Sequence, residues 1–338
     1  MDTANPWPTH GWTTAAPEDA GLDPTRLRQA RDYAGGACIV TRHGRQVASW
    51  GDCRKRFDIQ SATKSIGVTA LGLAIVDGKV QLADPAMRHH PDVGVPPESN
   101  RETGWLGEIS LLHLATMTAG FDKEGGYTLL LFRPGSKWAY SDGSANWLAE
   151  CLTLAYGRDL AALMYERVFA PLGLSGDDLS WRDNIHRPGE LGGIANREIG
   201  AGIFASVDAL ARIGYLYLRC GRWQARQIIP ADFVDLVRQP SPAAAGLPVV
   251  NDPQDRFGGA PSHYGLLWWN NRDGALADVP RDAFWGYGLG DSLVAAIPSL
   301  DVVVARSGSA WPGSRKPSYY RVLAPFLGAI VGALRHGA

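Results

Sequence analysis

Hydrophobic and polar positions alternate with two different periods along the chain. Short runs rich in β-branched and aromatic residues predict strands near both ends, over 37–42, 45–50, 264–269, 291–297 and 301–306. Apolar residues three and four apart predict helices elsewhere, over 23–34, 61–77, 109–120, 145–156, 160–169, 206–219, 230–238 and 318–335. Turns at 43–44 and 298–300 join neighbouring strands, which favours hairpins.

The order of these elements indicates the fold class. Strands at both ends with helices between them predict an α/β (α+β) fold, in which an antiparallel sheet is flanked by helices. Residues 1–79 and 205–338 would form one discontinuous α/β domain. Residues 80–204 carry little strand signal and would form an inserted, mainly helical domain, with the functional site at the interface. Residues 1–20 and 175–200 lack a regular pattern and are predicted to be irregular.

Composition narrows the class of protein. The 338 residues are 45% hydrophobic and 20% charged, and the net charge is -1, which is the balance of an ordinary globular protein. No basic run or basic amphipathic helix occurs, so we expect neither a nucleic-acid nor a membrane partner. No apolar span approaches the roughly 18 residues of a membrane helix. Four scattered cysteines without C-x-x-C spacing favour free thiols.

The first ten residues bear on location. Residues 1–10 lack the basic start and apolar core of a secretory signal. We therefore expect a cytoplasmic protein as the chain stands, or a periplasmic or secreted one if a signal has been removed. The sequence carries no indication of an oligomeric state.

The strongest candidate for chemistry is Ser61, which opens the apolar run over 61–77 and has Lys64 three residues later. Residues three apart share a helix face, so the hydroxyl and the amine can meet at the helix N-terminus. A serine becomes a nucleophile when a base takes its proton, and a partly desolvated lysine with a lowered pKa can be that base. The alternative is an ordinary N-cap serine followed by an exposed lysine. Other motifs must decide between the two.

Several stretches together resemble the serine β-lactamase and penicillin-binding superfamily, in the branch that holds class C β-lactamases, family VIII esterases and aminohexanoate-oligomer hydrolases. The resemblance rests on Ser61-x-x-Lys64 and on Tyr140-Ser141-Asp142, which follows Pro-Gly at 134–135. Connecting segments at 112–120, 202–212 and 264–269 are also similar, and the matches keep the family's order over about residues 18–335. This combination is far more specific than any single motif.

The resemblance implies roles for individual residues. Tyr140 would shuttle a proton between Ser61 and the leaving group, and the backbone N–H groups of Ser61 and Leu289 would form the oxyanion hole. Without Ser61, Tyr140 would be read as a core tyrosine. Asp142 stands where the family more often has asparagine, and it could pair with Lys64, orient a substrate amine or cap the following helix.

The third family motif is altered in this chain. Where the family has Lys-Thr-Gly or His-Thr-Gly on the strand facing the nucleophile, this sequence has Gly286, Tyr287 and Gly288, with neither a cation nor a threonine. We expect these residues to bind substrate, because strand glycines let a ligand lie close to the backbone, and a bulge or turn is the alternative. Trp138 and Trp285 are expected beside them, with Trp285 and Tyr287 lining an apolar pocket.

Competing motifs are weak. Neither Gly-x-Ser-x-Gly nor His-Glu-x-x-His occurs, and the two adjacent histidines at 89–90 lie in a proline-rich loop. A faint dinucleotide-binding pattern over 200–205 lacks a preceding strand and a ribose-binding acid. We therefore expect no cofactor and no metal.

These observations predict a serine hydrolase that forms an acyl-enzyme with a small-molecule ester or small amide. Ser61 would be the nucleophile, Lys64, neutral in the resting site, the base, and Tyr140 the proton shuttle. The missing cation in the third motif favours esters or small amides over β-lactams. One alternative is a β-lactamase or D-alanyl-D-alanine carboxypeptidase in which another cation, such as Arg306, binds the substrate carboxylate. A second is a non-catalytic, penicillin-binding-like sensor.

Overall fold

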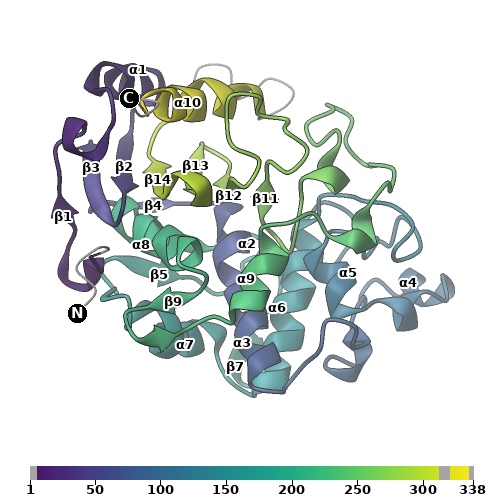
Figure 1. Cartoon of the computed structure of the whole chain (residues 1–338). Helices are drawn as coiled ribbons and strands as arrows, with labels where there is room; N and C mark the ends of the chain where they lie inside the picture. Colours follow the sequence, from purple (N-terminus) through teal and green to yellow (C-terminus); the bar gives the residue numbers. More distant parts are fainter. Residues whose placement is uncertain (1–5, 312–319, 335–338) are drawn as a thin grey trace.

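A seven-stranded sheet formed by both ends of the chain is the centre of the structure (Figure 1). The computed structural model describes residues 6–311 and 320–334. The strand order is β1-β3-β2-β14-β13-β12-β11. The strands are β1 (Thr13–Thr14), β2 (Ala37–Arg42), β3 (Arg45–Trp50), β11 (Trp269–Asn270), β12 (Phe284–Gly288), β13 (Ser292–Ile297) and β14 (Val302–Ser307).

The predicted antiparallel sheet is confirmed, with one exception at its edge. Every neighbouring pair is antiparallel except β1 and β3, which run parallel. Strand β14 lies between β13 and β2, so the two ends of the chain pair directly in the middle of the sheet. The expectation that residues 1–20 are irregular is therefore wrong for β1, whose two residues are too few to show a periodic pattern.

Helices cover both faces of this sheet. Helix α8 (Val207–Leu218) packs on β2, β13 and β14, while α1 (Pro24–Ala34) and α10 (Tyr320–Gly332) pack together on the other side (Figure 1). All six residues of β13 and of β14 are buried, as expected for strands covered on both faces. The predicted closing helix is confirmed within α10, and positions 318, 319 and 335 of that prediction lie outside the described residues.

A second, three-stranded sheet leads the chain into the predicted nucleophile. It consists of β4 (Arg56–Asp58), β8 (Ile203–Ser206) and β5 (Leu179–Trp181), with β8 in the middle. The expectation of irregular chain over 175–200 is wrong for β5, and for the two-stranded ribbon of β6 (Glu190–Leu191) and β7 (Ile194–Ala195). A further ribbon pairs β9 (Arg222–Trp223) with β10 (Arg226–Gln227).

The remaining helices lie in the part of the chain between β3 and β11. They are α2 (Ala62–Gly67), α3 (Thr69–Val76), α4 (Ser99–Glu102), α5 (Leu111–Ala115), α6 (Asp142–Tyr156), α7 (Leu160–Met164), which continues as a π-helical turn (Tyr165–Phe169), and α9 (Ala231–Val237). Residues 80–204 are thus mainly helical, and their separation as an inserted domain stays a prediction. No helix in the described part of the chain is both long and apolar enough to span a membrane.

Several predicted elements differ in extent, and the helix expected over 109–120 reduces to α5, which ends at Ala115. The helix expected over 61–77 is divided at Val68 into α2 and α3. The strand expected over 264–269 reduces to β11, because Leu267 takes a left-handed φ of 57° and its backbone turns away to pair with Ala115.

Candidate active site

A strained turn presents Ser61 at the start of α2. Strand β4 ends at Asp58, whose carboxylate accepts hydrogen bonds from the backbone N–H and the side-chain amide of Gln60 at 3.0 and 2.6 Å. Gln60 has a left-handed φ of 49°, a conformation that a non-glycine residue adopts only when its surroundings hold it there. The Asp58 contacts therefore fix the direction in which the chain enters α2.

The side chain of Ser61 does not cap the helix. It makes no capping hydrogen bond, which contradicts the ordinary N-cap alternative. Instead, Lys64 Nζ donates to Ser61 Oγ at 3.1 Å and to the carbonyl oxygen of Gly200 at 2.5 Å, and it forms an ion pair with Asp142. The Lys64 side chain is 1% exposed. The predicted meeting of the hydroxyl and the amine is thus present.

Asp142 is held between two lysines. Its two carboxylate oxygens contact Lys64 Nζ and Lys123 Nζ. Of the three roles considered for Asp142, the structure shows the pairing with Lys64. Helix capping is excluded, since α6 begins at Asp142 itself and the Ser141 hydroxyl accepts the capping hydrogen bond from the Ser144 N–H.

The charge state of Lys64 corrects the prediction of a neutral resting lysine. Burial alone would lower the pKa of Lys64, but the Asp142 carboxylate and Tyr140 outweigh this effect and raise the pKa above its usual value. Burial would likewise raise the pKa of Asp142, yet the Lys64 and Lys123 ammonium groups lower it. The resting pair is therefore an ammonium beside a carboxylate.

Tyr140 belongs to an aromatic wall beside this ion pair. Its ring stacks on Phe257 and on Trp269, with centroids 4.6 and 6.1 Å apart. The Lys64 and Lys123 ammonium nitrogens lie 4.9 and 5.4 Å from the centroid of the same ring. The structure therefore places Tyr140 within the influence of two cations, next to the amine that contacts Ser61.

Two predicted tryptophans do not reach the substrate space. Trp138 and Trp285 are both 0% exposed. Trp138 packs behind Tyr140 and Trp269, and Trp285 is covered by the ring of Tyr320 in α10 at 5.9 Å. The assignment of these two side chains to substrate binding is wrong. Trp269, which lies with them in the aromatic cluster, lines the cavity instead.

The glycines of the altered third motif serve packing. A Cβ on Gly286 would lie 2.8 Å from the Cβ and Oγ of Ser65, and a Cβ on Gly288 would overlap the Ile59 carbonyl oxygen. The space above both glycines is thus filled by α2 and the turn before it, which corrects their assignment to substrate contact. Both residues lie in the regular pairing of β12 with β13, so the bulge alternative is also excluded.

This close packing brings Leu289, the residue after β12, to the edge of the same site as Ser61. Within the described residues, no protein group accepts a hydrogen bond from the backbone N–H of either Ser61 or Leu289. Both N–H groups are therefore available to an oxyanion, as the predicted hole requires. Tyr287 also faces the cavity, where its hydroxyl contacts the buried carboxylate of Asp291.

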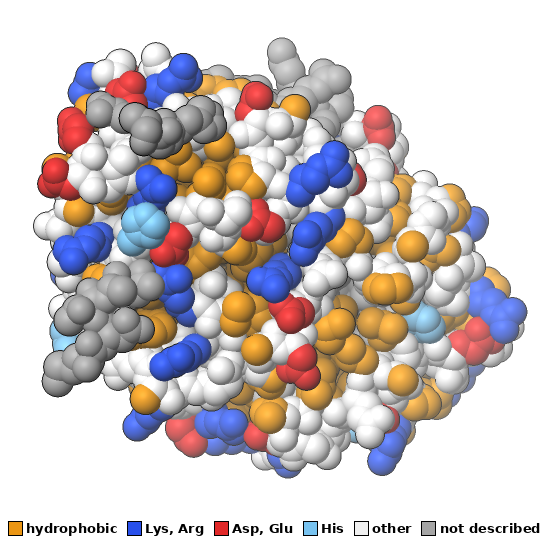
Figure 2. All heavy atoms as spheres, viewed as in Figure 1, with side chains coloured by type: hydrophobic (Ala, Val, Ile, Leu, Met, Phe, Trp, Pro, Cys, Tyr) orange, Lys and Arg blue, Asp and Glu red, His pale blue; other side chains and the backbone are white. Residues whose placement is uncertain are grey.

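These residues line a cavity of about 450 Å³. Its lining also contains residues that the sequence did not single out, and these are Gln60, Lys123, Arg182, Ile185, His186, Glu198, Ala201, Arg256 and Phe257. They lie on loops without periodic pattern, so no sequence signal marked them. On the face seen in Figure 2, cationic and anionic side chains are interspersed, with apolar side chains between them.

Arg306 is not available to a substrate. It is 0% exposed, and its guanidinium donates to the carbonyl oxygens of Ala34 and Asp291 at 2.5 and 2.8 Å and to Ser309 Oγ at 2.9 Å. The suggestion that Arg306 binds a substrate carboxylate is therefore wrong. Arg256, which lines the cavity, is a cation that could bind a substrate carboxylate.

The fold and the site together define a class: α/β proteins with a central antiparallel sheet, in which a serine at the start of a helix meets a lysine one turn later. A model of the beta-lactamase family matches residues 25–323. The chain belongs to the beta-lactamase family.

Two relatives match part of the chain. A beta-lactamase of Pseudomonas fluorescens is 28% identical over 182 residues, which are 46% of this chain and 48% of that protein. An uncharacterized protein of Alkalihalophilus pseudofirmus is 22% identical over 193 residues, which are 54% of each chain. The chain thus spans about half the length of these relatives.

Solved structures share the whole fold. A putative 6-aminohexanoate-dimer hydrolase from Bacillus anthracis covers 97% of this chain and 89% of its own, with a TM-score of 0.67 and 15% identity. EstCE1, titled a hydrolase with promiscuous acyltransferase activity, covers 91% and 97%, with a TM-score of 0.65 and 18% identity. At such identities the likeness concerns the fold, and it confirms the predicted fold class.

Proposed function

We propose that the protein is a serine hydrolase that cleaves carboxylic esters or small amides through an acyl-enzyme on Ser61. The observation that carries this proposal is the 3.1 Å contact between Lys64 Nζ and Ser61 Oγ in a cavity that Tyr140 also lines. A structural serine would cap its helix, whereas this hydroxyl is held by a buried, charged amine. Beside it lie two N–H groups that donate to no acceptor among the described residues. Such an arrangement suits nucleophilic catalysis.

In the proposed reaction, Tyr140 relays the proton of Ser61 toward the leaving group while Ser61 Oγ attacks the carbonyl carbon. The Lys64 ammonium does not act as the base, because Asp142 keeps it protonated. It orients Ser61 Oγ and stabilises the negative charge that develops on the Tyr140 oxygen during this relay. The Ser61 and Leu289 N–H groups bind the oxyanion. Tyr140 then gives its proton to the leaving group, and water releases the acyl group by the same steps.

A β-lactam or D-alanyl peptide remains the second candidate, and one observation favours it. Arg256 provides a cation in the cavity wall, and within the described residues its guanidinium makes no ion pair. A carboxylate of the substrate could bind there. Three similar proteins are compatible with either substrate class: those named as an aminohexanoate-dimer hydrolase, a hydrolase with promiscuous acyltransferase activity and a beta-lactamase.

Parallel assays with a short-chain p-nitrophenyl ester and nitrocefin test the proposal. We expect faster turnover of the ester, and Ser61→Ala should reduce its kcat by about a thousandfold or more, since the nucleophile is lost. Tyr140→Phe should retain the fold and lose most of the activity. Clearly faster nitrocefin turnover would favour the second candidate. Stable labelling by a fluorescent penicillin without turnover would indicate a sensor, and full activity of Ser61→Ala would refute the assignment.

A further inference from the structure

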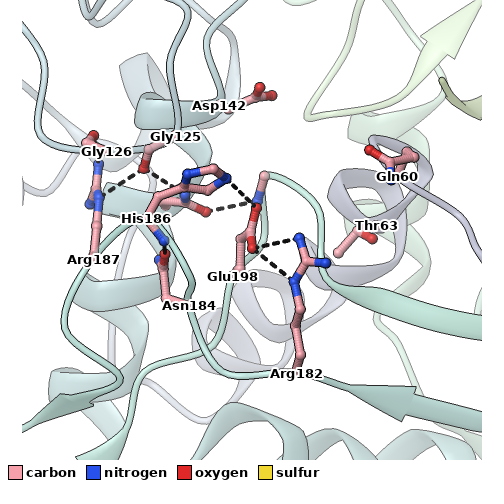
Figure 3. Close-up of polar contacts among 12 residues, drawn as sticks. Gln60, Thr63, Gly125, Gly126, Asp142, Arg182, Asn184, His186, Arg187 and Glu198 are labelled. Carbon is pink, nitrogen blue, oxygen red and sulfur yellow. Dashed lines mark hydrogen bonds and ion pairs between the residues drawn. The ribbon is translucent and has the colours of Figure 1, made fainter.

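Three polar side chains form one part of the cavity wall, outside the Ser61, Lys64 and Tyr140 machinery. Arg182 and His186 come from the loop after β5, and Glu198 from the segment before β8 (Figure 3). Glu198 is 1% exposed, although it borders the cavity. A buried carboxylate needs hydrogen-bond donors at both oxygens, so the distribution of its partners shows what a ligand could add.

The partners of Glu198 are unevenly distributed. Arg182 Nε and Nη2 both donate to Oε2, at 3.2 and 3.0 Å. The other oxygen, Oε1, has only His186 Nε2 at 3.7 Å, which is beyond hydrogen-bond distance. Arg182 Nη1, in turn, only approaches Asp58 Oδ2 at 3.9 Å. In the described part of the chain, one acceptor on Glu198 and one donor on Arg182 are thus left without a hydrogen-bond partner.

The backbone that carries these groups is firmly held. The Asn184 side chain accepts the N–H of His186 at 2.9 Å, and the buried Arg187 donates to the carbonyl oxygens of Gly125 and Gly126 at 3.1 and 3.0 Å (Figure 3). Trp181 Nε1 donates to the backbone oxygen of Glu198 at 2.8 Å. The acceptor and the donor are therefore fixed before any ligand binds, which favours specific recognition.

The balance of charge in the cavity decides which kind of hydrogen-bond donor Glu198 can bind. The charged residues of the cavity lining are Lys123, Arg182 and Arg256 against Asp142 and Glu198, and the Lys64 ammonium lies just behind. This excess of positive charge opposes a cationic amine at Glu198. A neutral N–H meets no such repulsion. A secondary amide carries both groups, an N–H on one edge for Glu198 Oε1 and a C=O on the opposite edge for Arg182 Nη1.

We propose that Glu198 and Arg182 form a subsite that selects substrates carrying a neutral amide group away from the scissile bond. The amide N–H donates to Glu198 Oε1 and its carbonyl oxygen accepts from Arg182 Nη1, while His186 covers the outer side. The proposal rests on the proposed function, because it assigns a substrate class to the Ser61 site. It adds specificity determinants and no chemical step.

Three p-nitrophenyl esters of equal chain length test this subsite. The acyl groups are γ-acetamidobutanoyl, the methyl ketone in which CH₂ replaces the N–H, and heptanoyl. We expect kcat/KM for the amide to exceed that for the ketone by about tenfold or more, since a hydrogen bond to a charged acceptor is strong. Glu198→Gln presents an amide N–H₂ or a weaker acceptor. It should reduce the ratio of kcat/KM for the amide ester to that for the ketone ester to about threefold or less. Ratios within one variant cancel any loss common to all esters.

The control variant is Glu166→Gln, which removes an exposed carboxylate on the π-helical continuation of α7 from its ion pair with Arg158. It should leave the ratio unchanged. Binding of the esters to Ser61→Ala, measured by the change in aromatic fluorescence, gives a readout without turnover. The amide ester should bind more tightly than the ketone ester, and Glu198→Gln in the same background should abolish the difference.

The subsite would be overturned if wild type hydrolysed the amide and ketone esters with equal kcat/KM and Ser61→Ala bound them equally tightly. The hydrolase proposal would remain intact. A preference for an aminohexanoyl ester over the amide would also overturn it, because a cation would then be favoured. Absence of all Ser61-dependent turnover, combined with selective amide binding, would instead contradict the hydrolase and retain the subsite.

Discussion

At the scale of single residues, Asp142 determines the electrostatic character of the site. With a neutral asparagine at this position, burial would be the main influence on the pKa of Lys64. The carboxylate instead holds two ammonium groups, one buried on Lys64 and one half-exposed on Lys123. The site therefore places two ammonium groups beside the Tyr140 ring, where they stabilise negative charge that develops on its oxygen in the proposed reaction.

Asp142→Asn tests this role. Burial alone lowers the pKa of Lys64, so removal of the carboxylate should let the ammonium lose its proton at lower pH. Because the proposed reaction needs the ammonium, the alkaline limb of kcat/KM should move to lower pH by about one unit or more. The pH profiles of wild type and variant measure this, with the exposed Asp19→Asn as a control. An unchanged limb would contradict the role of Asp142.

Some of the site residues could be predicted from the sequence because their spacing carries the chemistry. Ser61 and Lys64 lie one helical turn apart, whereas Tyr140 could be predicted only through the resemblance of Tyr140-Ser141-Asp142 to a family motif. Glu198 and Arg182 could not be predicted, since each comes from a loop and acquires meaning only when the loops meet. Trp138 and Trp285 were misassigned because proximity in sequence to a site does not show on which side a ring packs.

At the scale of elements, the approach of β12 to α2 positions the predicted oxyanion hole. Gly288→Ala would place a Cβ on the Ile59 carbonyl oxygen, so β12 must move away from the Ser61 turn. We expect kcat to fall by about a hundredfold or more, as on losing an oxyanion donor. Ester hydrolysis and the melting temperature measure the effect on activity and on folding.

The matched control for this substitution is Gly107→Ala, at an exposed glycine where a Cβ would meet nothing within 4 Å. It should leave kcat and the melting temperature essentially unchanged. Wild-type kcat in Gly288→Ala would show that the spacing between β12 and α2 does not position the Leu289 N–H.

A buried ion cluster joins α6 to the loop that carries His186. Glu150 Oε1 lies 3.3 Å from Arg187 Nη1, both side chains are 0% exposed, and His90 contacts the other Glu150 oxygen at 3.1 Å. Glu150→Gln removes the negative charge and leaves Arg187 buried without an ionic partner. We expect a loss of about 3–5 kcal/mol in the free energy of unfolding, measured by urea denaturation. A loss as small as that of the exposed Glu166→Gln would contradict this role.

The sequence predicted the strands with six residues that are joined in pairs by tight turns, namely β2 with β3 and β13 with β14. Their runs of strand-forming residues beside turn residues leave a clear signal. The missed strands β4, β5 and β8 have three or four residues each, and they pair across long stretches of sequence. Such strands exist because tertiary contacts complete them, so local pattern does not reveal them.

At the scale of the whole molecule, Arg306 connects distant parts of the chain. Its guanidinium joins the end of α1 at Ala34, the β12–β13 turn at Asp291 and Ser309 beyond β14. Burial lowers the pKa of Arg306 to about 10, so it stays charged at neutral pH. The pairing of β14 with β2 makes the sheet depend on both chain ends. Arg306 holds the end of α1, the helix that covers this part of the sheet.

Arg306→Met should therefore destabilise the protein as a whole. Methionine fills much of the space but donates no hydrogen bond, so the buried carbonyl oxygens of Ala34 and Asp291 lose their donors. We expect a loss of about 2–6 kcal/mol in the free energy of unfolding, from about 1–3 kcal/mol for each oxygen, measured by urea denaturation. The exposed Arg28→Met should change little. A selective rise in KM for penicillins with unchanged stability would contradict the structural role and restore Arg306 as a carboxylate anchor.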